Sequence, residues 1–393
     1  MTRAPAATLL AAVALLLTGC SAAAPVPAPS STAPASAEPA PTPTPTPDPV
    51  EALSLEQRVG QLFMVGTPAD AASPVSLSAV GDRHVGAIFL HGRSQAGTAG
   101  TAAVVARFTG LAASATDVPL WVATDQEGGE VQVLRGSGFD DMPYGIRQAD
   151  RPDAELRTDA ERWGGQLRAA GVTMNLAPVA DIVSSAETRF DNPPIGGLGR
   201  QYGYDLATVA AKAGAFADGM RAAGVMPTLK HFPGLGRVSA NTDFAARVVD
   251  DVVAADSPDV AVYAELIADG PAVVMLSTAV YERIDPATPA AFSAPVLDVL
   301  RTRVGFDGVA ITDDLSAAAA AQAWSPADRA VLAVSAGVDV VLASADPGVL
   351  AEMYDAVLSR AQADPVFAER VTASASRVLA AKAALSGRTG VRP

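Results

Sequence analysis

Eight short apolar runs recur along the chain with helix-length segments between them, and this alternation constrains the fold more than any other feature. Amphipathic stretches such as 154–170 and 205–223 lie between the runs and end at glycine. Unbroken apolar strands that alternate with helices indicate a parallel sheet buried on both faces. Eight such units predict a single-domain (β/α)8 barrel of the TIM type, with a doubly wound open sheet as the alternative. The expected strands are residues 62–65, 86–90, 119–124, 172–177, 225–229, 272–276, 308–311 and 338–342.

Charged side chains lie where several of these runs end. Asp125 follows the third run and Asp181 comes after the fourth. Lys230 and His231 follow the fifth, and Asp313 comes at the end of the seventh. In a barrel, the carboxyl ends of the strands meet at the face that holds binding and catalytic groups. One Asp at a strand end is usually a helix cap, but agreement among four strands favours a functional site.

Charge and residue usage limit the possible partners and cofactors. A formal net charge of −14 disfavours nucleic acid, whose phosphates need a basic surface. The histidines are His84, His91 and His231, and none of them falls in a metal-ligand spacing. No glycine-rich phosphate loop with a following lysine is present. We therefore expect no metal, no cofactor and no nucleic-acid partner, and a monomeric protein.

The first residues are typical of an export signal. Arg3 precedes an apolar run at 9–17 that is too short to span a bilayer. Small residues then lead to Cys20, the only cysteine in the chain, in a pattern that resembles the lipobox of bacterial lipoproteins. We expect lipid attachment at Cys20, with a lone structural thiol as the alternative. The protein would then be anchored at the extracytoplasmic face of the cell membrane.

These features divide the chain into four expected parts. Residues 1–20 would be the signal peptide, and residues 21–50, rich in Pro, Ala and Thr, a semi-rigid linker. The barrel would occupy 51–388, followed by a tail at 389–393.

Three motifs follow the barrel strands in order: Asp125-Gln126-Glu127-Gly128-Gly129, Lys230-His231-Phe232-Pro233-Gly234 and Ile311-Thr312-Asp313-Asp314-Leu315-Ser316. Together they resemble glycoside hydrolase family 3, in its single-domain β-N-acetylhexosaminidase branch, from about residue 53 to about residue 385. The resemblance implies a retaining exo-hydrolase that removes terminal GlcNAc from cell-wall-derived or other extracellular glycans through an aspartyl-glycosyl intermediate. The partner would then be a small glycan.

The resemblance also implies roles for the residues at the strand ends. Asp313 would be the nucleophile, and the adjacent Asp314 would point elsewhere or cap the following helix. Charged hydrogen bonds would hold the sugar hydroxyls. The residues expected to bind sugar are Asp125, Arg200, Lys230 and His231, with Asp181 in support.

Two positions depart from the family pattern. An arginine expected at Val133 is missing, which would alter the preference for an anionic sugar beside the scissile bond. Where the family carries an Asp-x-His dyad with His as acid/base, this chain has Asn241 and Asp243. A carboxylic acid can replace the imidazole if burial or a neighbouring anion raises its pKa. Asp243 would then be the acid/base, held by a hydrogen bond from Asn241, and weakened activity is the alternative.

Ionised Asp243 would also repel phosphate, so hydrolysis is favoured over transfer to phosphate. Two other functions fit the same motifs. One is a non-catalytic glycan-binding lipoprotein that kept the pocket and lost its acid, and the other is a β-glucosidase-type member of the family.

Overall fold

The structure is a computed structural model that describes the backbone of residues 49–389 and the side chains of residues 49–384. The predicted signal peptide, Cys20, the linker through residue 48 and the tail beyond residue 389 lie outside the described residues. Val50, which the sequence placed in the linker, belongs to the 3-10 turn Pro49–Ala52 and is 2% exposed. Among the described residues, none of the helices combines the length and apolar character that a bilayer span requires.

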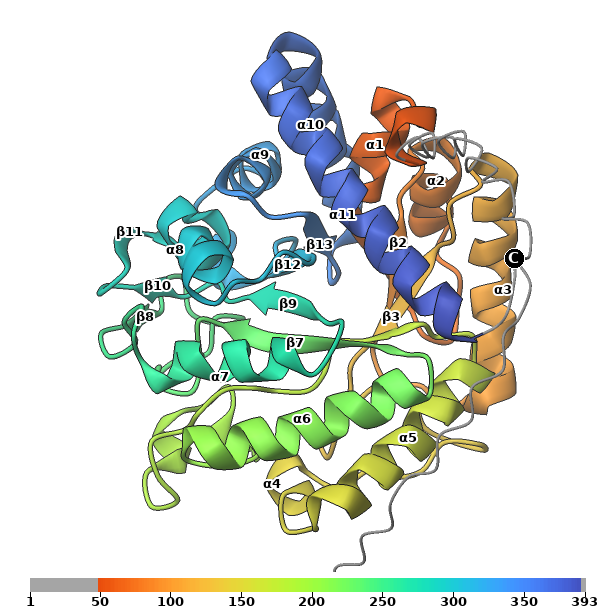
Figure 1. The fold of residues 1–393 in the computed structure, drawn as a ribbon. Helices are drawn as coiled ribbons and strands as arrows, with labels where there is room; N and C mark the ends of the chain where they lie inside the picture. The colour runs from red at the N-terminus through yellow and green to blue at the C-terminus, as the bar shows by residue number, and fades with distance from the viewer. Residues whose placement is uncertain (1–48, 390–393) are drawn as a thin grey trace, which may run out of the picture. The chain divides into compact units, whose positions relative to one another are not determined.

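Eight parallel strands close into a barrel surrounded by helices, as the sequence predicts (Figure 1). The order around the barrel is β1-β13-β12-β9-β7-β6-β3-β2. Each predicted apolar run overlaps one barrel strand, although β6 is shorter than expected. The barrel strands are β1 (Phe63–Pro68), β2 (Ala87–His91), β3 (Trp121–Thr124), β6 (Met174–Asn175), β7 (Met226–Phe232), β9 (Val273–Leu276), β12 (Ala310–Asp314) and β13 (Val340–Ala343).

Helix boundaries follow local capping chemistry. The predicted helices at 154–170 and 205–223 are α5 and α6. The Asp205 carboxylate caps α6 by accepting a hydrogen bond from the Thr208 N–H at 2.8 Å. Gly171, at φ +79°, follows the end of α5. The helices are α1 (Leu55–Gln61), α2 (Pro74–Asp82), α3 (Gly97–Ala115), α4 (Gly145–Gln148), α5 (Asp153–Ala169), α6 (Leu206–Ala222), α7 (Pro258–Ala268), α8 (Ala294–Asp298), α9 (Pro326–Ala336), α10 (Leu350–Ala363) and α11 (Pro365–Thr389).

Two small sheets that the sequence did not predict lie in the loops that follow barrel strands. The hairpin β4 (Gln126–Gly128) and β5 (Val131–Gln132) follows β3 directly. A three-stranded sheet joins β8 (Val249–Asp250), β10 (Val280–Tyr281) and β11 (Asp285–Pro289). These strands are too short for a periodic pattern to reveal them.

Apolar side chains fill the barrel interior. Met64, Trp121, Met226 and Ile311 belong to this inner cluster, which is separate from the larger one between the sheet and the helices. Val378 of α11 packs against the inner cluster. Figure 1 shows α11 lying across the barrel. The interior is thus packed rather than open, and access to the strand ends must come from the side away from α11.

A lysine from α11 completes this closed end. Lys382 Nζ donates hydrogen bonds to Gln61 Oε1 and to the Gly86 carbonyl, each at 2.8 Å. It also lies 5.6 Å from the centre of the Trp121 ring. Burial lowers the pKa of Lys382 to about 7, and its hydrogen bonds to Gln61 and Gly86 connect α11 to the barrel.

Candidate active site

A pocket of about 270 Å³ lies at the carboxyl ends of the barrel strands. Its floor includes apolar side chains from the inner cluster, namely Phe89, Leu176, Met275 and Leu342. Every residue predicted for catalysis or sugar binding contributes to the wall. Those residues are Asp125, Arg200, Lys230, His231, Asn241, Asp243 and Asp313.

A larger cavity, of about 450 Å³, lies toward α11 at the other end of the barrel. Its charged lining consists of Asp307 and Arg377, and the rest is apolar side chains and backbone. The convergence of charged groups makes the smaller pocket the candidate functional site, although it is not the larger of the two. Within the described part of the chain, no cluster of three or more His, Cys, Asp or Glu side chains is arranged to hold a metal ion.

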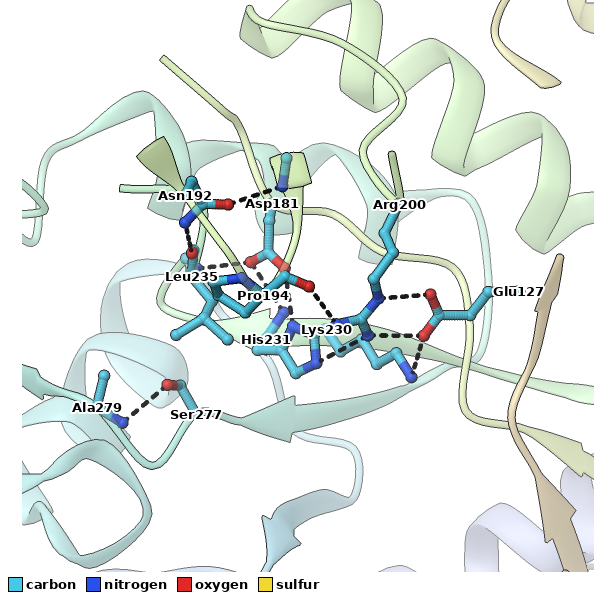
Figure 2. A network of polar contacts seen from close by, with 12 residues as sticks. Glu127, Asp181, Asn192, Pro194, Arg200, Lys230, His231, Leu235, Ser277 and Ala279 are labelled. Atoms are coloured by element: carbon cyan, nitrogen blue, oxygen red, sulfur yellow. Dashed lines mark hydrogen bonds and ion pairs between the residues drawn. The ribbon is translucent and has the colours of Figure 1, made fainter. Parts of the chain in front are cut away.

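A buried ion cluster forms one wall of the pocket (Figure 2). Arg200 donates from Nε and Nη2 to the two carboxylate oxygens of Glu127, at 2.8 Å each. Lys230 Nζ lies 2.6 Å from Glu127 Oε1 and 2.6 Å from Asp125 Oδ1. The bidentate Arg200–Glu127 pair and the contacts of Lys230 with both carboxylates fix the two cations in place. Asp125, the most exposed residue of the cluster, faces the pocket.

The cluster keeps its charges despite burial. Burial alone would raise the pKa of Glu127, but the charges of Arg200 and Lys230 outweigh it and hold that pKa well below the usual range. Burial likewise acts to lower the pKa of Lys230, but the carboxylates of Asp125 and Glu127 raise it overall. Both partners are therefore ionised at neutral pH.

Glu127 belongs to the first motif, but no role was predicted for it from the sequence. One signal could have found it, because two cations predicted in an apolar pocket need buried counter-ions. Arg200 lies 73 positions from Glu127 in the chain, so the pairing appears only in three dimensions. Gln148 then fixes the motif, since its Nε2 donates to the Glu127 carbonyl at 2.6 Å.

We expect Glu127→Gln to lower the free energy of unfolding by about 3–5 kcal/mol, because it leaves Arg200 and Lys230 under-compensated in a buried site. KM for an aryl glycoside should rise as well, since both cations lose their fixed positions. Chemical denaturation and steady-state kinetics would measure the two effects. Glu161→Gln, an exposed position on α5, is the matched control. A stability loss no larger than that of the control would contradict the structural role of the ion cluster.

Asp181 lies directly behind His231 and is fully buried. Its Oδ2 is 2.8 Å from His231 Nδ1, and its Oδ1 accepts hydrogen bonds from the backbone N–H groups of His231 and Leu235, at 3.1 and 2.7 Å. The other ring nitrogen, Nε2, points to the pocket and lies 3.5 Å from Arg200 Nη2. Asp181 is not among the residues that line the pocket, so it orients the imidazole from behind; Figure 2 shows its contact with His231.

Two adjacent aspartates end β12, and they are used differently. Asp314 accepts hydrogen bonds from the backbone N–H groups of Ser316 and Ser344, at 3.0 and 2.8 Å, and from the Ser316 hydroxyl at 2.6 Å. It therefore ties together the loops that follow β12 and β13. Asp313 accepts one hydrogen bond, from the backbone N–H of Asp314 at 2.8 Å, and lines the pocket. Asp314 was expected to point elsewhere or to cap the following helix. It lines the pocket as well, and its carboxylate caps the turn at 315–317 rather than a helix.

Asp243 lies on the loop after β7 and lines the same pocket as Asp313. The residue is exposed overall, yet its carboxylate faces a concave surface that removes part of its hydration. This dehydration, and secondly the charge of Asp313, raise the pKa of Asp243 to about 6. The backbone carbonyls of Thr242 and Asp243 accept hydrogen bonds from Ala320 and Ala319, at 3.1 and 3.2 Å, which fix the loop.

The expected partner of Asp243 contacts a different atom from the one predicted. Asn241 Oδ1 accepts a hydrogen bond from the Asp243 backbone N–H at 2.9 Å and thus holds the turn rather than the carboxylate. Val133, where the family pattern predicts an arginine, is 8% exposed and packs into the core. Val131, two residues earlier, lines the pocket instead.

Comparisons with known proteins agree with this geometry. The profile of the glycosyl hydrolase family 3 N terminal domain matches residues 54–381. The crystal structure of a β-N-acetylhexosaminidase from Beutenbergia cavernae is 57% identical, with a TM-score of 0.82 over 84% of this chain and 99% of that chain. A glycoside hydrolase family 3 β-N-acetylglucosaminidase from Paenibacillus sp. is 33% identical, with a TM-score of 0.79 over 87% of this chain and 64% of that one. The β-hexosaminidase LpqI of Mycobacterium tuberculosis is 34% identical over 304 residues, which are 74% of this chain and 73% of that protein.

Proposed function

This chain belongs to glycosyl hydrolase family 3, and on that premise we propose that it is a retaining exo-β-N-acetylhexosaminidase. Its substrates would be cell-wall-derived or other extracellular glycans that end in GlcNAc. One observation carries the proposal: Asp313 and Asp243 line one pocket, and the pKa of Asp243 is raised to about 6 there. Retaining hydrolysis requires such a pair, one carboxylate to attack and one carboxylic acid to protonate the leaving group.

In the first step, Asp313 attacks the anomeric carbon of the terminal sugar and the bond to the leaving oxygen breaks. Asp243, whose raised pKa of about 6 keeps it protonated at a higher pH than an ordinary aspartate, gives its proton to that oxygen. A glycosyl ester on Asp313 results. The ester has no negative charge, so one cause of the raised pKa of Asp243 is removed, and Asp243 stays ionised as the carboxylate that general-base catalysis needs.

In the second step, Asp243 takes a proton from water while the water oxygen attacks the anomeric carbon. The ester bond breaks, Asp313 returns as a carboxylate, and Asp243 is again protonated. Two displacements at one carbon give net retention of configuration. Atoms and charges balance without a cofactor.

Substrate binding would fall to the ion cluster and to His231. Asp125 faces the pocket as a hydrogen-bond acceptor, and Lys230 and Arg200 are charged donors already fixed by Glu127. Preorganised charged groups bind hydroxyls with strict direction because no side chain has to move. A small pocket with an apolar floor suits the terminal unit of a glycan, which supports exo action.

The direct test is turnover of 4-nitrophenyl β-GlcNAc and of the matching β-glucoside, together with trapping of the intermediate. An activated fluoro glycoside should leave a sugar on the peptide that contains Asp313, which mass spectrometry would locate. We expect turnover of the GlcNAc substrate and a much slower reaction with the glucoside. Sugar affinity without turnover would instead identify a glycan-binding protein, and preference for the glucoside would identify a β-glucosidase.

We also propose that Cys20 carries a lipid that anchors the enzyme at the extracytoplasmic face of the membrane. The small residues before Cys20, which resemble a lipobox, support this, and a cysteine that carries two or more acyl chains would hold the protein stably on the membrane. Cys20→Ser should move the protein from the membrane fraction to the soluble fraction, as judged by cell fractionation and immunoblotting. Ser21→Ala is the control. Unchanged partitioning of Cys20→Ser would rule out the anchor.

A further inference from the structure

Residues 315–324, called here the connecting segment, lie between the end of β12 and the start of α9. They contact the loop that carries Asp243, because the N–H groups of Ala319 and Ala320 donate to the carbonyls of Asp243 and Thr242, at 3.2 and 3.1 Å. Among the described residues, these are the hydrogen bonds that join residues 239–247 to another part of the chain. The position of Asp243 therefore depends on the connecting segment.

The other hydrogen bonds of the Asp243 loop are local. The side-chain and backbone oxygens of Asn241 accept from the backbone N–H groups of residues 243–245. Phe244, the residue after Asp243, is 85% exposed, so the outer side of the loop faces solvent. Local hydrogen bonds give such a turn its shape but do not fix its position on the barrel, which needs contacts with another segment.

The connecting segment is also joined to the proposed nucleophile. Asp314 accepts hydrogen bonds from the Ser316 N–H at 3.0 Å and from the Ser316 hydroxyl at 2.6 Å, and Asp313 directly precedes it. Both carboxyl groups of the proposed reaction are therefore connected to the same ten residues. A retaining glycosidase that uses two carboxyl groups needs them about 5–5.5 Å apart, so a shift of this segment would change a distance on which the reaction depends.

A buried arginine on α9 holds the connecting segment. Arg329 is 4% exposed. Its Nη1 donates to the carbonyls of Leu315 and Ser316, at 2.6 and 3.0 Å. Its Nε donates to the Trp324 carbonyl at 2.9 Å, and its Nη2 donates to Gln322 Oε1 at 3.0 Å. One guanidinium thus fixes both ends of the segment.

Gln322 extends these contacts to the middle of the segment. Its Nε2 donates to the carbonyls of Ser316 and Ala318, at 3.2 Å each, and Ala318 directly precedes the two N–H donors. Among the described residues, Arg329 forms no ion pair, and its N–H groups donate to carbonyl and amide oxygens instead. A buried guanidinium costs free energy to dehydrate and is usually paired with a carboxylate. Its use on one stretch of backbone favours a role in positioning that stretch.

We propose that Arg329 is a positioning residue for the catalytic acid: it fixes the connecting segment, which in turn places Asp243 opposite Asp313. Arg329 is not among the residues that line the pocket, so it acts through the backbone N–H groups of Ala319 and Ala320. The inference rests on the proposed glycosidase function. Because Asp313 belongs to β12 itself, loosening the connecting segment should impair proton donation more than nucleophilic attack.

Ala319→Pro tests the contact between the two loops. Ala319 begins a 3-10 turn, and Ala318 before it is extended, at φ −54° and ψ 125°. Proline is tolerated at the first residue of such a turn, so this change removes the N–H that binds the Asp243 carbonyl and keeps the turn. We expect kcat/KM to fall about 10-fold for a GlcNAc disaccharide, and about twofold or less for 4-nitrophenyl β-GlcNAc, whose leaving group needs little protonation.

Arg329→Gln should give the same selective loss, and the ratio of the two rates corrects for any loss of folded protein. The falling limb of the pH profile for the disaccharide should also move to lower pH. A displaced Asp243 would be better hydrated and farther from Asp313, and both changes would lower its pKa from about 6. The other charged groups that act on the Asp243 carboxylate are Arg200, His231 and Asp314.

Arg157→Gln, which removes an exposed charge from α5, is the control for loss of an arginine and should keep the wild-type ratio. Equal losses on both substrates in Arg329→Gln, with an unmoved pH limb, would make Arg329 a structural residue and overturn the inference. Wild-type kinetics in Ala319→Pro would overturn it as well. Absence of turnover of both GlcNAc substrates by the wild type would refute the glycosidase function itself, and the inference with it, so the two failures are distinguishable.

Discussion

Asp313→Asn is expected to reduce kcat/KM for 4-nitrophenyl β-GlcNAc by about 10⁴-fold or more, the scale seen when a covalent nucleophile is removed. The amide is a poor nucleophile and cannot form the glycosyl ester. It keeps the shape of the side chain and an oxygen for the Asp314 N–H, so folding should be preserved. Steady-state kinetics and a thermal melt would separate lost chemistry from lost structure. Asp307→Asn, at the far end of the barrel, is the control.

A second form of the same experiment identifies the face of attack. Asp313→Ala leaves space for a small anion, and added azide should restore turnover by taking the place of the carboxylate. The product should be the α-glycosyl azide, because a single displacement inverts the anomeric centre. A loss below about tenfold in Asp313→Asn would contradict the assignment and would indicate that the substrate's own acetamido group attacks.

Asp243→Asn is expected to have an effect that depends on the leaving group. A sugar leaving group needs a proton, so kcat/KM for a GlcNAc disaccharide should fall by about 10²- to 10⁴-fold. A 4-nitrophenolate leaves without much help, so the aryl substrate should lose far less in the first step. Parallel kinetics on the two substrates would measure the difference. Equal losses on both would remove Asp243 from the acid role.

The pH dependence of the disaccharide reaction provides a separate check on Asp243. The acid must start protonated, and a pKa of about 6 keeps it protonated about two pH units higher than an ordinary aspartate. Activity should therefore be high below about pH 6 and fall as the pH rises through that value. The falling limb should disappear in Asp243→Asn. A limb that remains in the variant would belong to another group.

The barrel could be predicted because its strands carry a strong local signal. Strands buried on both faces are apolar throughout, and the helices between them have their own period, so β7 and β13 were as visible as β1. The pocket could be predicted for a topological reason, since a barrel brings its strand ends together. The hairpin of β4 and β5 was missed because strands of three and two residues have no measurable period.

The side-chain contacts that could not be predicted from the sequence depend on distances between atoms in the folded chain. Asn241 was expected to contact the Asp243 carboxylate, but a side chain two residues away reaches the backbone N–H more easily. Glu127 was not assigned a role because its partners, Arg200 and Lys230, come from other segments of the chain. A separate cavity of about 220 Å³ is lined by residues near 145 and by residues near 190. No local sequence pattern links those two segments.

The hydrogen bonds of Asp314 have a mechanical consequence for the rim of the barrel. Because one side chain joins the turn after β12 to the backbone at Ser344, these two strand ends shift as one body. Asp313 is the immediate neighbour of Asp314, so the direction of its carboxylate depends on these hydrogen bonds. A substitution that alters the backbone at Ser344 would therefore change the direction of the Asp313 carboxylate. In kinetic measurements such a variant would resemble one that lacks a catalytic group, although the cause would be steric.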